Sequence, residues 1–440
     1  MKHNIDLIEF ERVLDENKSA FLCGNGFSMN FDSNFSNIFD RLYDAHKELL
    51  EHSQYKVNAP KPAFNKKCKD NYKSAKQFFK HKSKEELYKI FEDGLLFAES
   101  IRENNPLINE LWEKRWIISL EFGLSQYDLL DKICNIGRKW GVQYVNIEYW
   151  TILVYFYYAI KELKSPYYIF PIENSFIHAI KAGDKSEIRL TDVFFEKILF
   201  NGFCLYYRML FSIAIFANGR GIDTTLLNKT RELDGVSIKN FLDKFDYLLT
   251  LNYDHLLEMI SGRRVDHFHG EFGINKLEYV YYQSFLLKYK GKEISFSDIL
   301  IGDYFMFKQY AALIQGFSEG GSKGLQYRMR KSFSNKMQSI VQQNRINIVV
   351  IFGMNIDNDQ HVLRNLMVSF YQAKIKKPKI IYCYFTDQER VDFEEQYEAV
   401  ITFGEDLNTY ARGIEVLFIK TENILNEYFS KNTVVQHIVN

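Results

Sequence analysis

Three short polar stretches carry residue types that could bind a phosphate or take part in catalysis. Gly24-Asn25-Gly26 ends an apolar run and is followed by Ser28, TLNYD spans Thr250 to Asp254, and GMNIDND spans Gly353 to Asp359. Glycine lets a backbone approach a phosphate closely, but it serves a plain tight turn equally well. The first stretch alone therefore fits either use, and the elements around the three stretches have to be considered together.

Each stretch coincides with the end of a run that predicts a buried β-strand. These runs are Ala20 to Cys23, Phe245 to Asn252, and INIVVIFG from Ile346 to Gly353. Continuous apolar and β-branched runs are typical of strands buried on both faces of a parallel sheet. Ligands of open α/β sheets bind outside the carboxyl ends of the strands, so we expect the three stretches to line one site. The sequence HFHG, from His267 to Gly270, follows shortly after the second stretch and is expected near the same edge.

The C-terminal hundred residues predict alternating strands and helices. Lys379 to Phe385 and Gly413 to Ile419 read as two further buried strands. Thr386-Asp387-Gln388-Glu389 has the pattern of a capping box, which would open a helix running through Val400. Another helix is predicted after GMNIDND from an apolar stripe formed by Val362, Leu363, Leu366, Met367, Phe370 and Tyr371. Strand, helix, strand, helix, strand at this spacing is half of a doubly wound parallel sheet.

The sequence therefore predicts an α/β protein with a Rossmann-like, doubly wound parallel sheet and a large, mostly helical insertion. The sheet domain is predicted to be discontinuous and to comprise residues 1–53 and 241–440. It includes a helix from about Asn37 to His52. The insertion is predicted at residues 54–240, because this part is mostly helical in period and rich in aromatic residues, as in Glu148 to Leu163.

Composition excludes several classes of protein. The 440 residues carry a formal net charge of zero, so no overall field attracts nucleic acid or an anionic membrane. The five cysteines are scattered without CxxC spacing, which indicates neither a zinc module nor a disulfide framework and fits a reducing cytoplasm. The most apolar region, Val193 to Gly219, holds no run of 18 uncharged residues and predicts buried helix. We expect a cytoplasmic protein that does not enter a membrane.

One segment is strongly basic. Lys61 to Lys84 contains nine lysines against the single acid Asp70, with aromatic residues between them. Such a run is most often the solvated face of a helix, and that interpretation is favoured here. Contact with the phosphate backbone of a nucleic acid is the alternative.

The polar stretches also resemble a known family. GNGFS at 24–28, TLNYD at 250–254, HFHG at 267–270 and FGMNIDND at 352–359 resemble, in order, the signature elements of the sirtuin-like superfamily. The resemblance is greater to the bacterial sirtuin-like branch of anti-phage defence, in which NAD is hydrolysed. The four-cysteine zinc module of sirtuin deacylases is not matched, nor is the segment that follows their glycine loop. The resemblance thus implies an NAD-splitting core without zinc.

The resemblance also implies roles for individual residues, with NAD as the substrate. Asn252 would orient the ribose and the attacking water, His269 would be the general base, and Asp254 would bind nicotinamide or favour the developing positive charge. Met354 stands where the family often has Ser, so Asn355 is expected to replace one hydrogen bond to the nucleotide. The residues implied in binding NAD are Gly24, Asn25, Gly26, Phe27, Ser28, Thr250, Gly353, Met354, Asn355 and Asp359.

Each of these residues also has a structural interpretation. Asn252 could satisfy local backbone groups at a strand end, and Asp359 could cap the helix that follows it. His269 alone could be a structural hydrogen-bonding histidine, and His267 is expected to be one. His361 is expected at the surface or bracing a loop. A metal site at His267 and His269 is not predicted, because no third ligand is evident in the sequence.

The function implied is an NAD glycohydrolase, expected to act as a triggered abortive-infection effector. An ADP-ribosyltransferase would use the same cleavage with a macromolecular acceptor. A non-catalytic module that senses NAD or ADP-ribose and regulates a partner is a third alternative. In each case we expect a homo-oligomer or a complex with a defence partner that controls activity.

Overall fold

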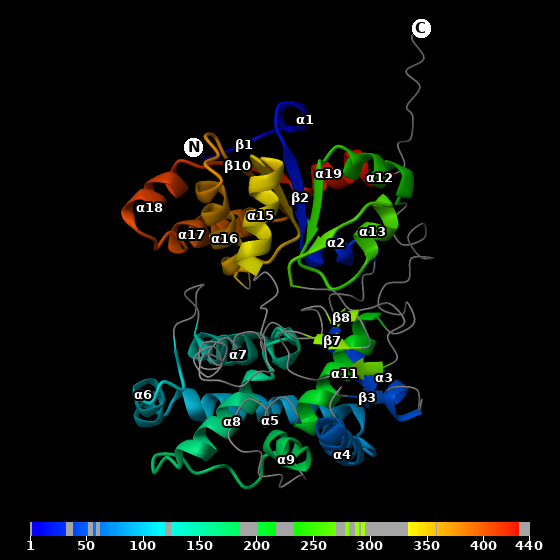
Figure 1. Cartoon of the computed structure of the whole chain (residues 1–440), viewed down its shortest axis with the longest axis vertical. Helices are drawn as coiled ribbons and strands as arrows, with labels where there is room; N and C mark the ends of the chain where they lie inside the picture. The colour runs from blue at the N-terminus through cyan, green and yellow to red at the C-terminus, as the bar shows by residue number, and fades with distance from the viewer. Residues whose placement is uncertain are drawn as a thin grey trace. The chain divides into compact units, whose positions relative to one another are not determined.

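The computed structural model describes residues 2–31, 38–51, 56–58, 62–118, 125–184, 201–216, 233–269, 278–280, 287–289, 292–294, 333–357 and 359–430. The chain divides into two compact units. The sheet unit comprises Met1–Ser36, Gly221–Glu271 and Lys331–Asn440, and the helical unit comprises Asn37–Arg220 and Phe272–Arg330. Figure 1 shows both units and labels many of their elements.

A seven-stranded sheet, parallel throughout, forms the centre of the sheet unit. Its order is β1-β11-β10-β9-β2-β4-β5. From β2 the chain adds β4 and β5 on one side and then returns to add β9, β10 and β11 on the other. The direction of winding therefore reverses between β2 and β9. The strands are β1 (Lys2–Asn4), β2 (Ser19–Cys23), β4 (Tyr247–Thr250), β5 (Asp266–His267), β9 (Ile348–Phe352), β10 (Lys379–Tyr384) and β11 (Glu415–Lys420).

Helices cover both faces of this sheet (Figure 1). Successive residues of a strand point to opposite faces, so Leu22 packs in one core layer and Phe21 in the other. The layer that contains Leu22 is completed by α15 (Phe333–Asn344), α16 (Gln360–Gln372), α17 (Asp387–Ala399) and α18 (Glu405–Arg412). The opposite layer is completed by α1 (Leu7–Asp15), α2 (Asn25–Met29), α12 (Gly235–Asp243), α13 (Leu256–Ser261) and α19 (Thr421–Tyr428). The predicted Rossmann-like, doubly wound α/β fold is confirmed.

The strands that the apolar runs predict are all present. Those expected at 20–23, 346–353, 379–385 and 413–419 are β2, β9, β10 and β11, and the run at 245–252 contains β4. The apolar stripe after GMNIDND belongs to α16. The edge strand β1 is not predicted, because its three residues are polar and carry no strand pattern.

The capping box predicted at Thr386 is only half formed. The Thr386 hydroxyl accepts the N–H of Glu389 at 3.1 Å and so starts α17. The Glu389 carboxylate accepts instead from the Phe385 N–H at 2.7 Å and from the Tyr382 hydroxyl at 3.0 Å. The glutamate therefore ties the helix to the end of β10 rather than to the capping residue.

The helical unit has an aromatic core. Phe79 stacks on Tyr206 with ring centroids 4.7 Å apart, and Phe91 meets Trp150 edge-on at 5.1 Å. Its helices are α3 (Ile38–Glu51), α4 (Pro62–Phe79), α5 (Lys84–Arg102), α6 (Asn105–Glu113), α7 (Gln126–Trp140), η2 (Val142–Tyr144), α8 (Ile152–Leu163), α9 (Ser175–Ala182) and α11 (Gly202–Phe216). Short strands pair as β3 (Lys56–Asn58) with β6 (Glu278–Val280), and β7 (Leu287–Tyr289) with β8 (Lys292–Ile294).

The division between the units differs from the predicted domain boundaries. Helix α3, which the sequence analysis groups with the sheet, belongs to the helical unit. It packs against α11, and the His46 Nδ1 lies 2.7 Å from the Tyr206 hydroxyl. Residues 272–330, predicted within the sheet domain, also belong to the helical unit. The N-terminal boundary therefore lies after Ser36 rather than after residue 53.

The lysine-rich segment forms α4 and the turn before α5. Lys66, Lys69 and Lys73 are exposed, whereas Tyr72 and Phe79 are buried against Tyr206. These two rings are therefore not available to stack on bases. Within the described parts of the chain, no helix is long and apolar enough to cross a membrane.

Candidate functional site

The three predicted polar stretches meet at one edge of the sheet. Strand β2 lies between β4 and β9 and pairs in parallel with both. The carboxyl ends of the three strands therefore lie side by side, next to the point where the winding direction reverses. In open α/β sheets this is where ligands bind.

The glycines of the first and third stretches serve to bring two loops together. A Cβ on Gly26 would lie 2.6 Å from the Gly353 Cα, and one on Gly24 would lie 2.7 Å from the Gly353 carbonyl oxygen. Gly353 itself has a φ of +62°, a left-handed conformation that favours glycine. Both positions of the Gly-X-Gly pattern are thus required by the contact between the loops after β2 and β9.

The same contact uses the backbone N–H groups of both glycines of the first stretch. The Gly24 N–H donates to the Phe352 carbonyl at 3.0 Å, and the Gly26 N–H donates to the Gly353 carbonyl at 2.8 Å. These two N–H groups are therefore engaged inside the protein, and the binding of NAD by residues 24–28 stays a prediction. The groups already have strong acceptors, as buried backbone donors must.

Two other residues implied in NAD binding belong to the core. Phe27 is fully buried and packs among Phe21, Phe31 and Phe352, and Met354 lies in the core layer on the other face. Their side chains do not line the loop surface. Among the described residues of these loops, the exposed side chains are those of Asn25, Asn355 and Asp357. The Asn355 Oδ1 accepts the N–H of Asp357 at 3.0 Å, which shapes the loop before α16.

A buried hydrogen-bond network joins the first two stretches. The Asn252 Nδ2 donates to the Gly24 carbonyl at 3.1 Å and to the Ser28 hydroxyl at 3.0 Å. Because a carbonyl can only accept, the orientation of this amide is fixed. The Ser28 hydroxyl in turn donates to the Asp254 Oδ2 at 2.6 Å. Among the described residues the Asn252 Oδ1 is buried without a hydrogen-bond partner.

Asp254 and Thr250 hold this network from the β4 side. The Asp254 Oδ1 accepts the N–H of Leu256 at 3.1 Å, and the Thr250 hydroxyl accepts the N–H of Asn252 at 3.0 Å. Burial raises the pKa of the Asp254 carboxyl, although its bonds from Ser28 and Leu256 favour the charged form. Thr250 is buried with its hydroxyl engaged inside the protein, so it supports the turn that carries Asn252.

His269 lies next to Asp359, the last residue of the third stretch, and to His361 in the first turn of α16. Its Nε2 is 2.9 Å from the His361 Nε2 and 4.0 Å from the Asp359 Oδ1. Burial lowers the pKa of the His269 imidazole to about 4, so the ring is uncharged at neutral pH. His361 is buried in α16, so of its two expected positions the one at the surface is wrong. Asp359 occupies the N-cap position of α16 but its side chain makes no capping bond.

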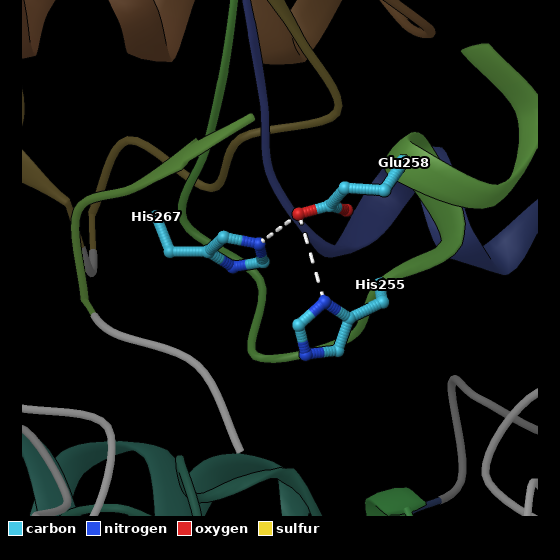
Figure 2. A group of neighbouring side chains, drawn as sticks. All are labelled: His255, Glu258 and His267. Atoms are coloured by element: carbon cyan, nitrogen blue, oxygen red, sulfur yellow. Dashed lines mark hydrogen bonds and ion pairs between the residues drawn. The ribbon is translucent and has the colours of Figure 1, made fainter. Parts of the chain in front are cut away.

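A second cluster of histidines and an acid lies beside Asn252. The His267 Nδ1 is 2.8 Å from the Asn252 carbonyl oxygen, and its Nε2 is 2.6 Å from the Glu258 Oε1. The His255 Nδ1 is 3.6 Å from the same oxygen (Figure 2). Sequence reasoning gave His267 a structural role and missed the other two. The His-x-x-Glu spacing at 255–258 was the available signal, since residues three apart share a helix face.

Both histidine clusters contain donor atoms that lie within 4.8 Å of one another. The first consists of His255, Glu258 and His267, and the second of His269, Asp359 and His361. The sequence analysis predicted no metal site because it had no third ligand. The fold supplies a carboxylate and a second imidazole to each histidine of HFHG.

The comparisons with known proteins add no relative: no protein-family model, curated protein or solved structure matches the chain. What the structure establishes is a Rossmann-like α/β protein with buried polar side chains at the winding reversal of its sheet.

Proposed function

We propose that the protein is an NAD glycohydrolase, which cleaves NAD to nicotinamide and ADP-ribose. The observation that carries the proposal is the Asn252 amide at the carboxyl end of β4. Its Nδ2 is held by Gly24 and Ser28, while its buried Oδ1 has no partner among the described residues. A fixed acceptor of this kind suits a ribose hydroxyl or an attacking water. Asn252 also lies in the segment that resembles the Asn-X-Asp element of sirtuin-like proteins.

Cleavage of the N-glycosidic bond expels neutral nicotinamide and leaves a ribosyl group with oxocarbenium character. The enzyme must therefore hold the nucleotide, place water against the ribose and accept a proton. In this proposal Asn252 orients the ribose and the water. Asp254 acts as a positioning residue, because its carboxylate contacts Ser28, which contacts Asn252.

His269 is the proposed general base. Its burial lowers the pKa of the ring to about 4, so the imidazole is uncharged and able to accept a proton at neutral pH. The Asp359 carboxylate, 4.0 Å from the Nε2, would stabilise the imidazolium that then forms. His361 fixes the orientation of the His269 ring through the contact between their Nε2 atoms.

Within the predicted loops, the contacts to the phosphates of NAD are assigned to side chains rather than to the backbone N–H groups of the glycines. The N–H groups of Gly24 and Gly26 are engaged with the loop after β9. In the proposal, the exposed amide side chains of Asn25 and Asn355 contact the polar part of the nucleotide instead. Gly24, Gly26 and Gly353 contribute by keeping the two loops in contact.

The physiological part of the proposal rests on the resemblance to the anti-phage branch. NAD hydrolysis would deplete the cell of NAD as an abortive-infection response. Such an activity requires control, which self-association or a partner protein would supply.

The proposal is tested with the purified full-length chain and NAD, by chromatography of nicotinamide and ADP-ribose. We expect Asn252→Ala and His269→Ala each to lower kcat/KM by about 100-fold or more, the usual loss for a positioned polar group or base. Asn105→Ala and His178→Ala are matched controls, because both residues are exposed in the helical unit. Their activity is expected to equal that of the unmodified chain.

Three results would contradict the proposal in different ways. Activity that survives both Asn252→Ala and His269→Ala would show that the residues are wrongly assigned. Transfer of label from NAD to a protein or nucleic acid in place of free ADP-ribose would identify a transferase. Tight NAD binding without turnover, with or without co-expressed neighbouring genes, would identify a sensing module.

A further inference from the structure

The cluster of His255, Glu258 and His267 joins a helix to a neighbouring strand. His255 is the N-cap residue of α13, Glu258 lies in its first turn, and His267 ends β5. Figure 2 shows the two imidazoles converging on the Glu258 carboxylate from different sides. His267 is buried, whereas the side chains of His255 and Glu258 are 18% and 23% exposed. An ion from solvent can therefore reach the cluster.

The contacts of His267 fix its tautomer. Its Nδ1 faces the Asn252 carbonyl oxygen at 2.8 Å, and a carbonyl can only accept, so Nδ1 carries the hydrogen. The Nε2 therefore presents a lone pair unless it is also protonated. It lies 2.6 Å from the Glu258 Oε1, and an unprotonated nitrogen and a carboxylate oxygen repel one another at that distance. A positive charge, either a proton or a metal ion, is required between them.

A metal ion can bind more of the nitrogen and oxygen atoms of the cluster than a single proton can. One proton bridges the His267 Nε2 and one carboxylate oxygen, whereas a metal ion can also engage the His255 Nδ1, which lies 3.6 Å from that oxygen. The Glu258 Oε2 is buried without a partner among the described residues. Two imidazoles and a carboxylate are one of the three-ligand sets of zinc, with a fourth position left open. The Nδ1 bond from His267 to a backbone carbonyl is the usual outer contact of a zinc-bound histidine.

We propose that His255, Glu258 and His267 form a binding site for a divalent metal ion of the zinc type. Ligand atoms in a tetrahedral zinc site lie about 3.3 Å apart, given bonds of about 2.0–2.1 Å. The distance of 3.6 Å between His255 and Glu258 is close to this value. The 2.6 Å contact of His267 has to lengthen by less than an ångström, which rotation of the Glu258 carboxylate provides. Binding displaces the proton shared by His267 and Glu258.

The other cluster fits a metal ion less well. The Nε2 atoms of His269 and His361 already lie at hydrogen-bonding distance from one another, and the nearest Asp359 oxygen is 4.0 Å from His269. These two nitrogen atoms thus already satisfy one another without an ion. The metal proposal does not rest on the proposed NAD chemistry, because none of its three ligands has a role in that reaction.

The test uses the full-length chain, freed of any affinity tag and treated with a chelator. Zinc chloride is titrated in a calorimeter, and cobalt(II) is used as a spectroscopic probe of tetrahedral nitrogen and oxygen ligation. We expect one equivalent to bind, with the intense visible bands of four-coordinate cobalt. Loss of an outer contact of a metal ligand costs about 10–100-fold in affinity, so loss of a ligand in His255→Ala or Glu258→Gln is expected to cost at least that much.

Two further variants, His178→Ala and His361→Gln, and a measurement of Tm serve as controls for zinc binding. His178→Ala removes an exposed histidine of the helical unit and should bind zinc like the unmodified chain. Zinc should raise the Tm of the unmodified chain and of His178→Ala but not that of Glu258→Gln, whose unliganded Tm reports its folding. The proposal is overturned if the unmodified chain binds no zinc, if both ligand variants bind with unchanged affinity, or if only His361→Gln loses binding.

Discussion

Two sets of loop contacts lie at the same edge of the sheet and are made by opposite means. The loops after β2 and β9 meet through their backbones, with the Gly26 N–H on the Gly353 carbonyl and no room for a side chain at either glycine. The loop after β4 contacts its neighbours through polar groups instead. The Asn252 Nδ2 donates to the loop after β2, and the His267 imidazole at the end of β5 lies 2.8 Å from the Asn252 carbonyl oxygen. Glycine spacing alone suggested phosphate binding at the first set. In the structure those glycines allow the two loops to pack together. The polar side chains lie at the second set.

This difference separates two kinds of effect. Substitution of a packing glycine should lower stability, and activity should fall only as far as folding does. Substitution in the polar network should change stability less, because its members are small groups held by one to three hydrogen bonds. We therefore compare replacements of a glycine, a carboxylate and a hydroxyl. The expected loss of stability becomes smaller in that order.

The largest loss is expected for Gly26→Ala. The new Cβ would lie 2.6 Å from the Gly353 Cα and 3.0 Å from its carbonyl oxygen, and both are backbone atoms. Such overpacking costs about 3 kcal/mol, which for a unit of this size lowers the Tm by about 6 °C or more. Differential scanning calorimetry of the full chain measures the shift. In a helix free of this contact, the same substitution would be stabilising.

Gly235→Ala is the matched control for that measurement. Gly235 begins α12 in the same unit, and no atom lies within 4 Å of a Cβ placed on it. Its Tm should be unchanged or slightly raised, by no more than about 1 kcal/mol of stability. Equal Tm values for the two variants would mean that the loops after β2 and β9 are not in contact, and would favour the phosphate-binding interpretation.

The sequence predicted the buried strands well because their signal is local. Every residue of β2 and β9 is buried, and all of them except Ser19 are apolar, so each strand can be recognised from its own residues. The edge strand β1 lacks this signal. The placement of α3 also could not be read from its own residues, because an apolar stripe fits a sheet and a helix such as α11 equally well.

The site was predictable in its location but not in its contacts. Strand ends placed Asn252 and His269 at one edge, which follows from parallel topology. The use of Gly26 could not be predicted, because its partner Gly353 is far away in the sequence. His361 and Glu258 were missed as neighbours of the HFHG histidines, since only the fold brings α16 and α13 to the end of β5.

An intermediate loss is expected for Asp254→Ala. It removes the acceptor of the Ser28 hydroxyl and of the Leu256 N–H, both inside the protein. A buried donor without a partner costs about 1–3 kcal/mol. We therefore expect the free energy of unfolding, measured by equilibrium denaturation, to fall by about 2 kcal/mol. Asp254→Asn retains one acceptor oxygen and removes a carboxylate whose pKa is raised by burial, so it should cost less than Asp254→Ala. The reverse order would show that the charge itself holds the network together.

The smallest loss is expected for Thr250→Val, which preserves the shape of the side chain. The Thr250 hydroxyl accepts the Asn252 N–H at 3.0 Å, and valine leaves this buried donor without its acceptor. We expect a loss of about 1 kcal/mol, measured by denaturation, and no loss for Thr250→Ser, which keeps the oxygen. Because the Thr250 hydroxyl is buried and bonds the Asn252 N–H, its role in the proposed reaction is to position Asn252, so kcat should fall more than the affinity for NAD. A selective rise in KM would instead place Thr250 in contact with the nucleotide, as the family resemblance implies.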